Sequence, residues 1–518
     1  MSVVTSRQAR TGRIQELGLL SVAYLISLVA WILVYYGVSN SLPEFWLPPN
    51  FWVVAGVAAV FLLGAHLIIR KLAPYADPVF FPAAVLLTGL GLAMIHRIDY
   101  ALVERGEGAE LKGQLALAIV GIVLMVATVA LLRDHRILRR YTYLSAIAGI
   151  ILLLMPMLPV IGRTINGARL WIVVAGFSYQ PAELAKIFLT IFFAGYLVVH
   201  RDNLSLSGPK VLGLQLPRLK HLAPLIIAWL AGMAILALER DFGTAILFFG
   251  LFVAMLYVAT ERLSWIIIGA LMSAAGVWAI VQMMPHIQAR FTVWLHAMDP
   301  EVYDAPYGSY QLVQGWFGMA SGGLFGTGFG QGSPANSYAS NSDFIIASFG
   351  EELGLVGVLG ILSIYLIIVG RAMKTGIDLR DGFGKLLASG FGFTIALQSF
   401  VVVGGITRVI PLTGLAMPFL ALGGSALLTN WIIIGMLIRM SDAARRPFTP
   451  ASTPLSAIRT GELPGIKSRS RKKKKDADDA EAASKPDDTT SAHTQADATP
   501  SADSPDDQDR NPTEVVRL

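Results

Sequence analysis

The chain has 518 residues, of which 54% are hydrophobic and only 15% are charged, and its formal net charge is +6. Soluble globular chains carry about 25% charged residues, so this composition argues against a soluble protein and against a nucleic-acid partner. Cysteine is absent and the eight histidines show no paired spacing, which excludes disulfides and thiolate chemistry and argues against a protein-built metal site.

Apolar runs long enough to cross a bilayer, about 18 residues or more, recur along the chain. There are twelve of them, at 16–38, 51–69, 79–96, 113–132, 141–160, 182–199, 222–238, 242–260, 264–282, 343–370, 386–405 and 414–438. Their length excludes a membrane barrel, whose strands are about 10 residues long with alternating faces. The sequence therefore predicts an all-α polytopic membrane protein.

Lysine and arginine predict the orientation, because cytoplasmic loops are enriched in them. The N-terminus, the short loops that include 70–71, 133–140, 200–221 and 371–385, and the segment after 439 are basic. We therefore expect a multi-pass protein of the bacterial plasma membrane with both termini in the cytoplasm. Four unusual segments, at 162–186, 239–244, 283–341 and 404–425, then share the extracytoplasmic face.

The first two segments place ionisable residues at helix ends. Arg163 and Arg169 flank an Asn-Gly turn signal, and Glu183 and Lys186 are spaced to share one helical face. Ionisable residues at membrane depth are costly, so this pair is either a structural ion pair or functional. In the second segment, Asp241 is best interpreted as the cap of the next helix.

The third segment, 283–341, is long for a connection without a span, and long loops tend to be functional. Asp299 precedes a proline and reads as a turn former, whereas Asp343 reads as a helix cap or first-turn acid. Asp304 has no such local role. The glycines at 322–332 are weak evidence for a backbone nest that binds a phosphate.

The fourth segment is rich in glycine and proline and carries Arg408 and Ser425. Irregular backbone at membrane depth is tolerated where it is buried in protein or lines a cavity. Together the four segments bring cations suited to a lipid-linked phosphate near carboxylates, one of which could act as a general base toward a hydroxyl.

At these residues the chain resembles the shape, elongation, division and sporulation (SEDS) family, which includes RodA, FtsW and SpoVE. The shared motifs occur in order over 79–442: NGA-x-x-WI, QP-x-E-x-x-K, D-x-G-T, D-x-P-Y-G-S-YQ, N-x-DFI, GEELG, PLTG, PF and GGS. Details around 239–244 and 437–442 look more like actinobacterial RodA than FtsW. The resemblance implies a ten-span core, preceded within 1–78 by two extra spans and followed by a disordered cytoplasmic tail at 443–518.

The resemblance also implies roles for single residues. Asp304 matches the essential loop aspartate and is the expected catalytic base. The expected substrate-binding residues are Arg163, Arg169, Glu183, Lys186, Asp241, Gln311, Arg408 and Ser425. The chain departs from the family pattern at Leu170, where an arginine is usual, and at Arg240, where a proline is usual.

The activity implied by the resemblance is an inverting glycosyl transfer that polymerises lipid II into β-1,4-linked glycan during cell-wall elongation. The donor is the growing glycan on undecaprenyl pyrophosphate, and Arg, Lys or a phosphate-bound divalent cation (Mg or Mn) would neutralise the leaving group. No organic cofactor is expected. The resemblance implies a class B penicillin-binding protein as the transpeptidase partner.

Three alternatives to this interpretation stay open at the level of sequence. A lipid II flippase would need ionisable groups through the membrane midplane, and a non-catalytic scaffold for a transpeptidase would not need Asp304. A role in division rather than elongation is also compatible with the motifs. Polymerisation of purified lipid II separates the enzyme from the flippase and the scaffold.

Overall fold

The computed structural model describes residues 6–39, 47–159, 161–165, 168–174, 177–205, 210–211, 214–215, 219–306 and 308–447. The predicted Asn166-Gly167 turn and the predicted disordered tail beyond 447 lie outside these residues. The start of that predicted tail is helical, because the last helix extends to Arg445.

Helices form most of the described chain. The α-helices are α1 (Ser6–Ser39), α2 (Phe51–Leu72), α3 (Phe80–Glu104), α4 (Leu111–Leu131), α5 (Thr142–Leu154), α6 (Pro181–Ser205), α7 (Leu219–Glu239), α8 (Phe242–Thr260), α9 (Ser264–Met283), α10 (Pro285–Leu295), α11 (Pro300–Tyr303), α12 (Tyr310–Gly322), α13 (Ile345–Asp378), α14 (Gly382–Ile406) and α15 (Gly424–Arg445). Short 3-10 helices are η2 (His135–Tyr141), η3 (Met155–Met157) and η4 (Pro334–Asn336).

Eleven helices of the described residues are long and apolar enough to cross a membrane. The twelfth predicted run, 222–238, lies in α7, where the apolar helix found among described residues, Trp229–Glu239, is shorter than a span. The all-α prediction needs one correction, because short strands occur between helices. Strands β1 (Gly162–Ile165), β2 (Ala168–Val174) and β3 (Phe177–Tyr179) form an antiparallel sheet, and β4 (Lys210–Val211) pairs with β5 (Leu214–Gln215).

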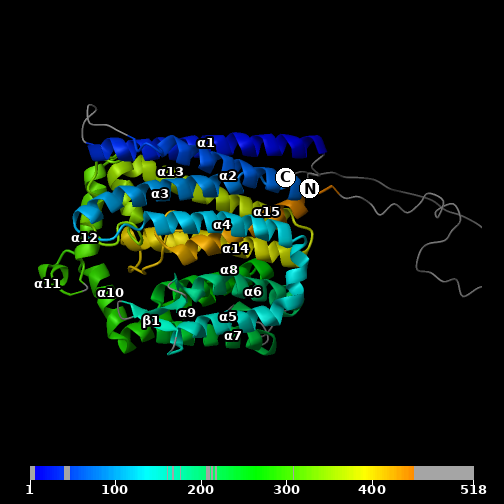
Figure 1. Cartoon of the computed structure of the whole chain (residues 1–518). Helices are drawn as coiled ribbons and strands as arrows, with labels where there is room; N and C mark the ends of the chain where they lie inside the picture. The colour runs from blue at the N-terminus through cyan, green and yellow to red at the C-terminus, as the bar shows by residue number, and fades with distance from the viewer. Residues whose placement is uncertain are drawn as a thin grey trace, which may run out of the picture. The chain divides into compact units, whose positions relative to one another are not determined.

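The long helices run side by side along one axis (Figure 1). The helices α3, α6, α14 and α15 are the most buried of the spans, and they carry the largest apolar side chains of the core. In contrast, α2 and α9 expose rows of Val, Ile, Leu and Trp. An apolar exterior of this kind is expected where side chains face lipid.

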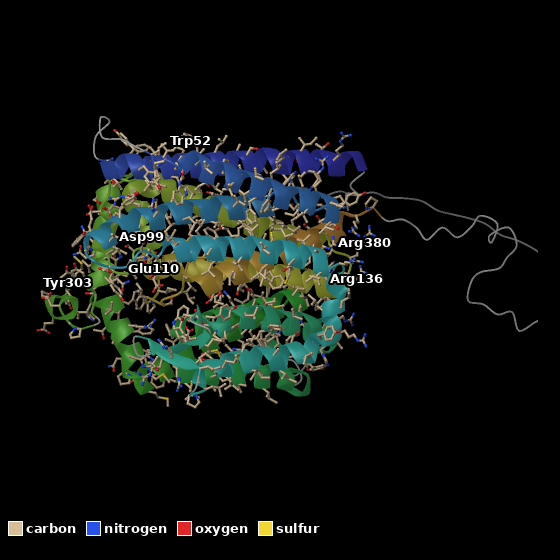
Figure 2. The ribbon with its side chains drawn as sticks, in the orientation of Figure 1. Trp52, Asp99, Glu110, Arg136, Tyr303 and Arg380 are labelled. Atoms are coloured by element: carbon tan, nitrogen blue, oxygen red, sulfur yellow. The ribbon has the colours of Figure 1, made fainter. Side chains whose placement is uncertain are left out.

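The basic loops meet at one end of the bundle, as the loop charges predicted. Asp77 pairs with both Arg371 and Arg445, and Asp381 accepts a hydrogen bond from His135 at 3.0 Å. Figure 2 shows Arg136 and Arg380 at this end and Tyr303 at the other. The structure therefore confirms which loops lie together, whereas it contains no membrane to orient them.

Helix α1 is attached to the rest of the bundle at both ends. Near the basic end, Glu16 forms ion pairs with Arg13 at 2.5 Å and with His66 of α2 at 2.7 Å, and all three side chains are buried. At the other end, Gly37 touches the backbone of Gly330: a β-carbon on Gly37 would lie 2.3 Å from the Gly330 oxygen. The close approach requires glycine at position 37.

Candidate active site at one end of the bundle

Glu183 and Lys186 form a buried ion pair in the first turns of α6. The Glu183 Oε2 to Lys186 Nζ distance is 2.5 Å, and the Lys186 side chain is 1% exposed. Lys186 also donates to Oε1 of Gln398 on α14 at 2.7 Å, and Gln398 donates to the Ala416 carbonyl at 2.8 Å. Because a buried charge pair needs its remaining hydrogen bonds satisfied, this pair ties α6 to α14 and to the segment before α15.

Asp241 caps α8, which confirms the local interpretation of this residue. Its Oδ1 accepts from the Thr244 amide at 2.9 Å, and its Oδ2 accepts from the side-chain amide of Gln180 at 3.4 Å. Burial raises the pKa of Asp241, whereas its hydrogen bonds with Thr244 and the nearby charge of Arg290 lower it. The backbone N–H of Gln180 donates to Ser425 Oγ at 2.8 Å, so the predicted residue Ser425 joins the start of α6 to α15.

Arg290 on α10 lies between two acids from different segments. Its Nη1 donates to the carbonyls of Leu412 and Thr413, both at 3.0 Å. Burial raises the pKa of Asp343 to about 6, and the positive charge of Arg290 opposes this rise. Burial also lowers the pKa of Arg290, while Asp241 and Asp343 raise it. We call Asp241, Arg290 and Asp343 the Arg290 cluster.

The interpretation of Asp343 as a cap or first-turn acid is wrong. The residue that precedes α13 is Phe344, the helix has no side-chain cap, and its first turn holds no acid. Asp343 forms no side-chain hydrogen bond or ion pair with the residues that the structure describes. Its carboxylate instead lies near Gly414, where an added β-carbon would be 3.6 Å from Oδ2. Asp343 is therefore a half-buried acid without a local structural role.

The glycine-rich turn at 326–332 is not an open nest for phosphate. The amide of Gly330 donates to Oε2 of Glu352 at 2.8 Å, and the amide of Gly328 donates to the Glu352 carbonyl at 3.0 Å. Arg97 of α3 donates to the Gly330 carbonyl at 3.1 Å and lies 3.4 Å from Glu352. Since the protein's own acceptors already occupy these amides, the turn serves as an anchor for the start of α13.

Four predicted substrate-binding residues lie outside the Arg290 cluster. Arg169 donates to the Leu158 carbonyl at 3.0 Å, and Gln311 donates to the Tyr338 carbonyl at 3.0 Å. Arg408 donates to the carbonyls of Trp294 and Leu295, at 2.8 and 2.6 Å. Arg163 is exposed on β1. Three of the four side chains thus donate hydrogen bonds to backbone carbonyls.

Asp304, the expected base, follows the short helix α11. This helix projects from the end of the bundle opposite the basic loops (Figure 1), where Figure 2 labels its residue Tyr303. Asp304 is exposed, and within the described residues its side chain has no hydrogen-bond or ion-pair partner. The structure therefore places Asp304 at an exposed tip and Asp343 in the half-buried Arg290 cluster.

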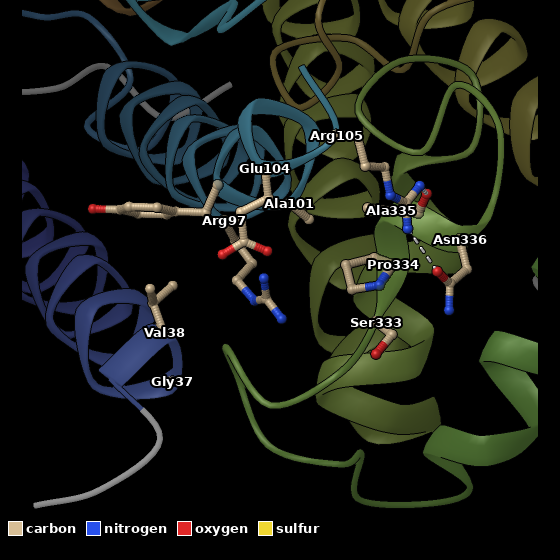
Figure 3. A pocket seen from close by; sticks show the side chains of 11 residues that line it. Gly37, Val38, Arg97, Ala101, Glu104, Arg105, Ser333, Pro334, Ala335 and Asn336 are labelled. Atoms are coloured by element: carbon tan, nitrogen blue, oxygen red, sulfur yellow. Dashed lines mark hydrogen bonds between the residues drawn. The ribbon is translucent and has the colours of Figure 1, made fainter. Parts of the chain in front are cut away.

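Two cavities lie near this end, beside the cluster rather than in it. One, of about 240 Å³, lies between the last turn of α1, the end of α3 and η4 (Figure 3). Arg105 closes one side of it by donating to Asn336 Oδ1 at 2.8 Å. The other, of about 200 Å³, is lined by α12, η4 and α13 and includes Glu351. Neither is lined by Asp241, Arg290 or Asp343.

The sequence did not single out Gln180, Arg290 or Gln398 as site residues. Gln180 belongs to a motif and could have been selected by it. Arg290 lies among many polar residues of the 283–341 segment, and Gln398 lies within an apolar run, so neither has a local sequence signal. No group of three or more His, Asp or Glu that could hold a metal occurs in the part of the chain that the structure describes.

The chain is similar to known proteins in sequence and in fold. The family model "Cell cycle protein" of FtsW, RodA and SpoVE matches residues 78–446, which begins after α2. The peptidoglycan glycosyltransferase RodA of Mycobacterium tuberculosis is 44% identical over 442 residues, which cover 84% of this chain and 92% of that protein. A probable peptidoglycan glycosyltransferase FtsW from a Geobacter species is 30% identical over 71% of this chain and 97% of its own length.

A solved structure shares the fold. It comes from a study of the structural coordination of polymerization and crosslinking by a peptidoglycan synthase complex. Its matching chain is 22% identical to this one, with a TM-score of 0.56. The match covers 71% of this chain and 98% of the other. Because the family model spans most of the chain and the 44% identical relative covers 84% of it, the chain belongs to the FtsW, RodA and SpoVE family and is a peptidoglycan glycosyltransferase.

Proposed function

We propose that this enzyme polymerises lipid II into β-1,4-linked glycan during cell-wall elongation. Identity to a RodA (44%) exceeds identity to an FtsW (30%), which favours elongation over division. The observation that supports the chemistry is the convergence of separate motif segments on one end of the bundle: the start of α6, the α7–α8 connection, the segment before α13 and the segment before α15. Two acids lie where these segments meet: Asp241, which is buried, and Asp343, which is half-buried next to Gly414.

In the proposed reaction, a carboxylate takes the proton from the acceptor GlcNAc 4-hydroxyl as that oxygen attacks C1 of the donor MurNAc. The undecaprenyl pyrophosphate leaves from the opposite face, so the α-linkage is inverted to β. A general base contributes about 100- to 10,000-fold to such a step. Family matching selects Asp304 for this role, and we propose Asp304 as the base.

Negative charge develops on the leaving pyrophosphate, and cations nearby would stabilise it. Lys186 is committed to Glu183 and Gln398, so Arg290 and the exposed Arg163 are the better candidates. A divalent cation would be bound through the phosphates of the substrate, because the described residues offer it no cluster of protein ligands. That cation would supply charge neutralisation, and a chelator should then lower turnover of purified enzyme.

The partner that we propose is a class B penicillin-binding protein, which would cross-link the new strand. The solved relative with the same fold was studied in a complex that coordinates polymerization and crosslinking, which supports this proposal.

The proposed active end faces the outside of the plasma membrane, since the opposite end carries the basic loops.

The test of orientation uses the absence of native cysteine. A cysteine at the exposed position Glu301 should react with a membrane-impermeant maleimide applied to intact cells, and one at the exposed position Arg140 should not. The reverse pattern would place the proposed site on the wrong face.

The test of function uses purified full-length protein and lipid II in detergent, with glycan length read by gel. Polymer formed without any transpeptidase supports the enzyme, and its absence under conditions where a known polymerase works contradicts the proposal. In proteoliposomes, transfer of labelled lipid II between leaflets without polymer would instead support a flippase.

A further inference from the structure

The cavity between α12, η4 and α13 is lined mainly by polar side chains. Its walls carry four serine hydroxyls, the side-chain amides of Gln314 and Asn336, and the carboxylate of Glu351. Phe317, whose side chain is 54% exposed, adds an aromatic wall. No described lysine or arginine lines the cavity, so it does not suit a phosphate. A neutral ligand that is rich in hydroxyl groups matches this mixture of donors and acceptors.

Glu351 presents a free hydrogen-bond acceptor to this cavity. Its Oε1 accepts from the backbone N–H of Ser333 at 2.6 Å, which holds the half-buried carboxylate in place. Its Oε2 has no hydrogen-bond or ion-pair partner among the described residues. Gly318 leaves room beside that oxygen, because a β-carbon at this position would lie 3.0 Å from Oε2. The cavity thus offers one anchored, negatively charged acceptor, which suits a ligand that donates O–H groups.

The same cavity is connected to the tip that carries the proposed base. Gln314, which lines the cavity, donates to the hydroxyl of Tyr303 at 2.9 Å, and Tyr303 directly precedes Asp304. The ring of Tyr303 also lies 5.4 Å from the ring of Tyr310, at the start of α12. Helix α12 therefore both supports the tip and forms a wall of the cavity. A substrate group bound in the cavity would lie at the end of the bundle where the base stands.

We propose that this cavity is a carbohydrate subsite that binds a sugar of the lipid II headgroup, with Glu351 Oε2 accepting a hydrogen bond from a sugar hydroxyl. The inference rests on the proposed function, and it assigns Glu351 to substrate binding rather than to proton transfer. Asn336 accepts from Arg105 through Oδ1, so its N–H groups are left to donate to an acetamido oxygen. Phe317 supplies an apolar face for the C–H groups of the ring.

The experiment measures kcat and KM for lipid II polymerisation by purified full-length variants. In Glu351→Gln an oxygen remains to accept from the Ser333 N–H, while an NH2 group replaces Oε2, so the free acceptor and its charge are lost. KM should rise about tenfold, the lower end for one hydrogen bond to a charged group, with kcat and the unfolding temperature near wild type. Glu107→Gln, at an exposed position outside the cavity, is the matched control and should leave KM unchanged.

Gly318→Ala provides an independent variant, because alanine favours a helix more than glycine does and α12 should keep its stability. The added β-carbon narrows the cavity at Glu351 Oε2, so KM should rise at least about fivefold, the lower end of the cost of overpacking a filled site. Wild-type KM in both variants, or a lower kcat at unchanged KM, would overturn the inference and leave the proposed function intact. If the wild-type enzyme forms no polymer, the proposed function fails and the inference fails with it.

A second substrate distinguishes a sugar from a charged amine as the occupant of the cavity. Lipid II whose stem-peptide amine is acetylated keeps every sugar hydroxyl but has no ammonium group. On this substrate the KM of Glu351→Gln should still exceed that of the wild type about tenfold. Equal KM values on the acetylated substrate, with the difference kept on unmodified lipid II, would assign the cavity to the peptide ammonium and overturn the sugar assignment.

Discussion

The tip at α11 and the Arg290 cluster both lie in or beside the long segment that precedes α13, and they differ in exposure and in nearby charge. Asp304 at the tip is exposed and has no partner among the described residues, whereas Asp343 in the cluster is half-buried and lies near the positive charge of Arg290. A base must hold its position to within a fraction of an ångström to reach a substrate hydroxyl. Neither acid has a side-chain hydrogen-bond or ion-pair partner among the described residues, so bound substrate would have to position Asp304 for the role of base.

The ion pair next to the cluster should show the largest effect of any single change outside the cluster. Lys186→Met leaves Glu183 charged and buried, which should cost about 3–5 kcal/mol of stability and abolish polymerisation. Thermal unfolding in detergent measures the first effect, and glycan synthesis measures the second. The double variant Lys186→Met with Glu183→Gln removes both charges and should recover much of the stability. An unfolding temperature that does not change in Lys186→Met would show that the pair is not buried.

The glycine-rich turn at 326–332 is held against α1, unlike the exposed tip at α11, and this contact can be tested. Gly37→Leu drives a side chain into the Gly330 backbone, and overpacking of this kind costs about 1–3 kcal/mol. Gly18→Leu on the same helix is the control, because a β-carbon there meets nothing within 4 Å. Unfolding temperatures of the two variants in one detergent give the comparison. Equal temperatures would mean that α1 does not support the turn.

The smallest effect is expected where one hydrogen bond links α6 to α15. Ser425→Ala removes the hydroxyl that accepts from the backbone N–H of Gln180. The free energy of unfolding should fall by about 1 kcal/mol. Ser321→Ala, at an exposed position on α12, should change the unfolding temperature less. A larger loss of activity than of stability in Ser425→Ala would indicate direct contact with substrate.

The spans, the shared end of the basic loops and the capping role of Asp241 could be predicted from the sequence because they depend on local properties. Hydrophobic length determines a span, loop charge determines which loops lie together, and an aspartate before a helix determines a cap. The Glu183–Lys186 pair belongs to the same class, since its members are three residues apart on one helix.

The remaining features depend on contacts between distant segments and could not be predicted in that way. Gln398 is paired with Lys186 across 212 positions, and Arg290 with Leu412 across 122. The glycines at 326–332 have the composition of an anion nest, but the amides of Gly328 and Gly330 donate to Glu352 of the following helix. Asp343 has the spacing of a first-turn acid, yet α13 begins only after it.

The most direct test of the account compares Asp343→Asn with Asp304→Asn in polymerisation of lipid II by the purified full-length enzyme. Asparagine keeps the size of each side chain but cannot accept the proton. The account predicts that Asp304→Asn loses at least about 100-fold in turnover, the lower range for a missing general base, while Asp343→Asn keeps more of its activity. Near wild-type turnover in Asp304→Asn, with Asp343→Asn inactive, would contradict the account and move the base to Asp343.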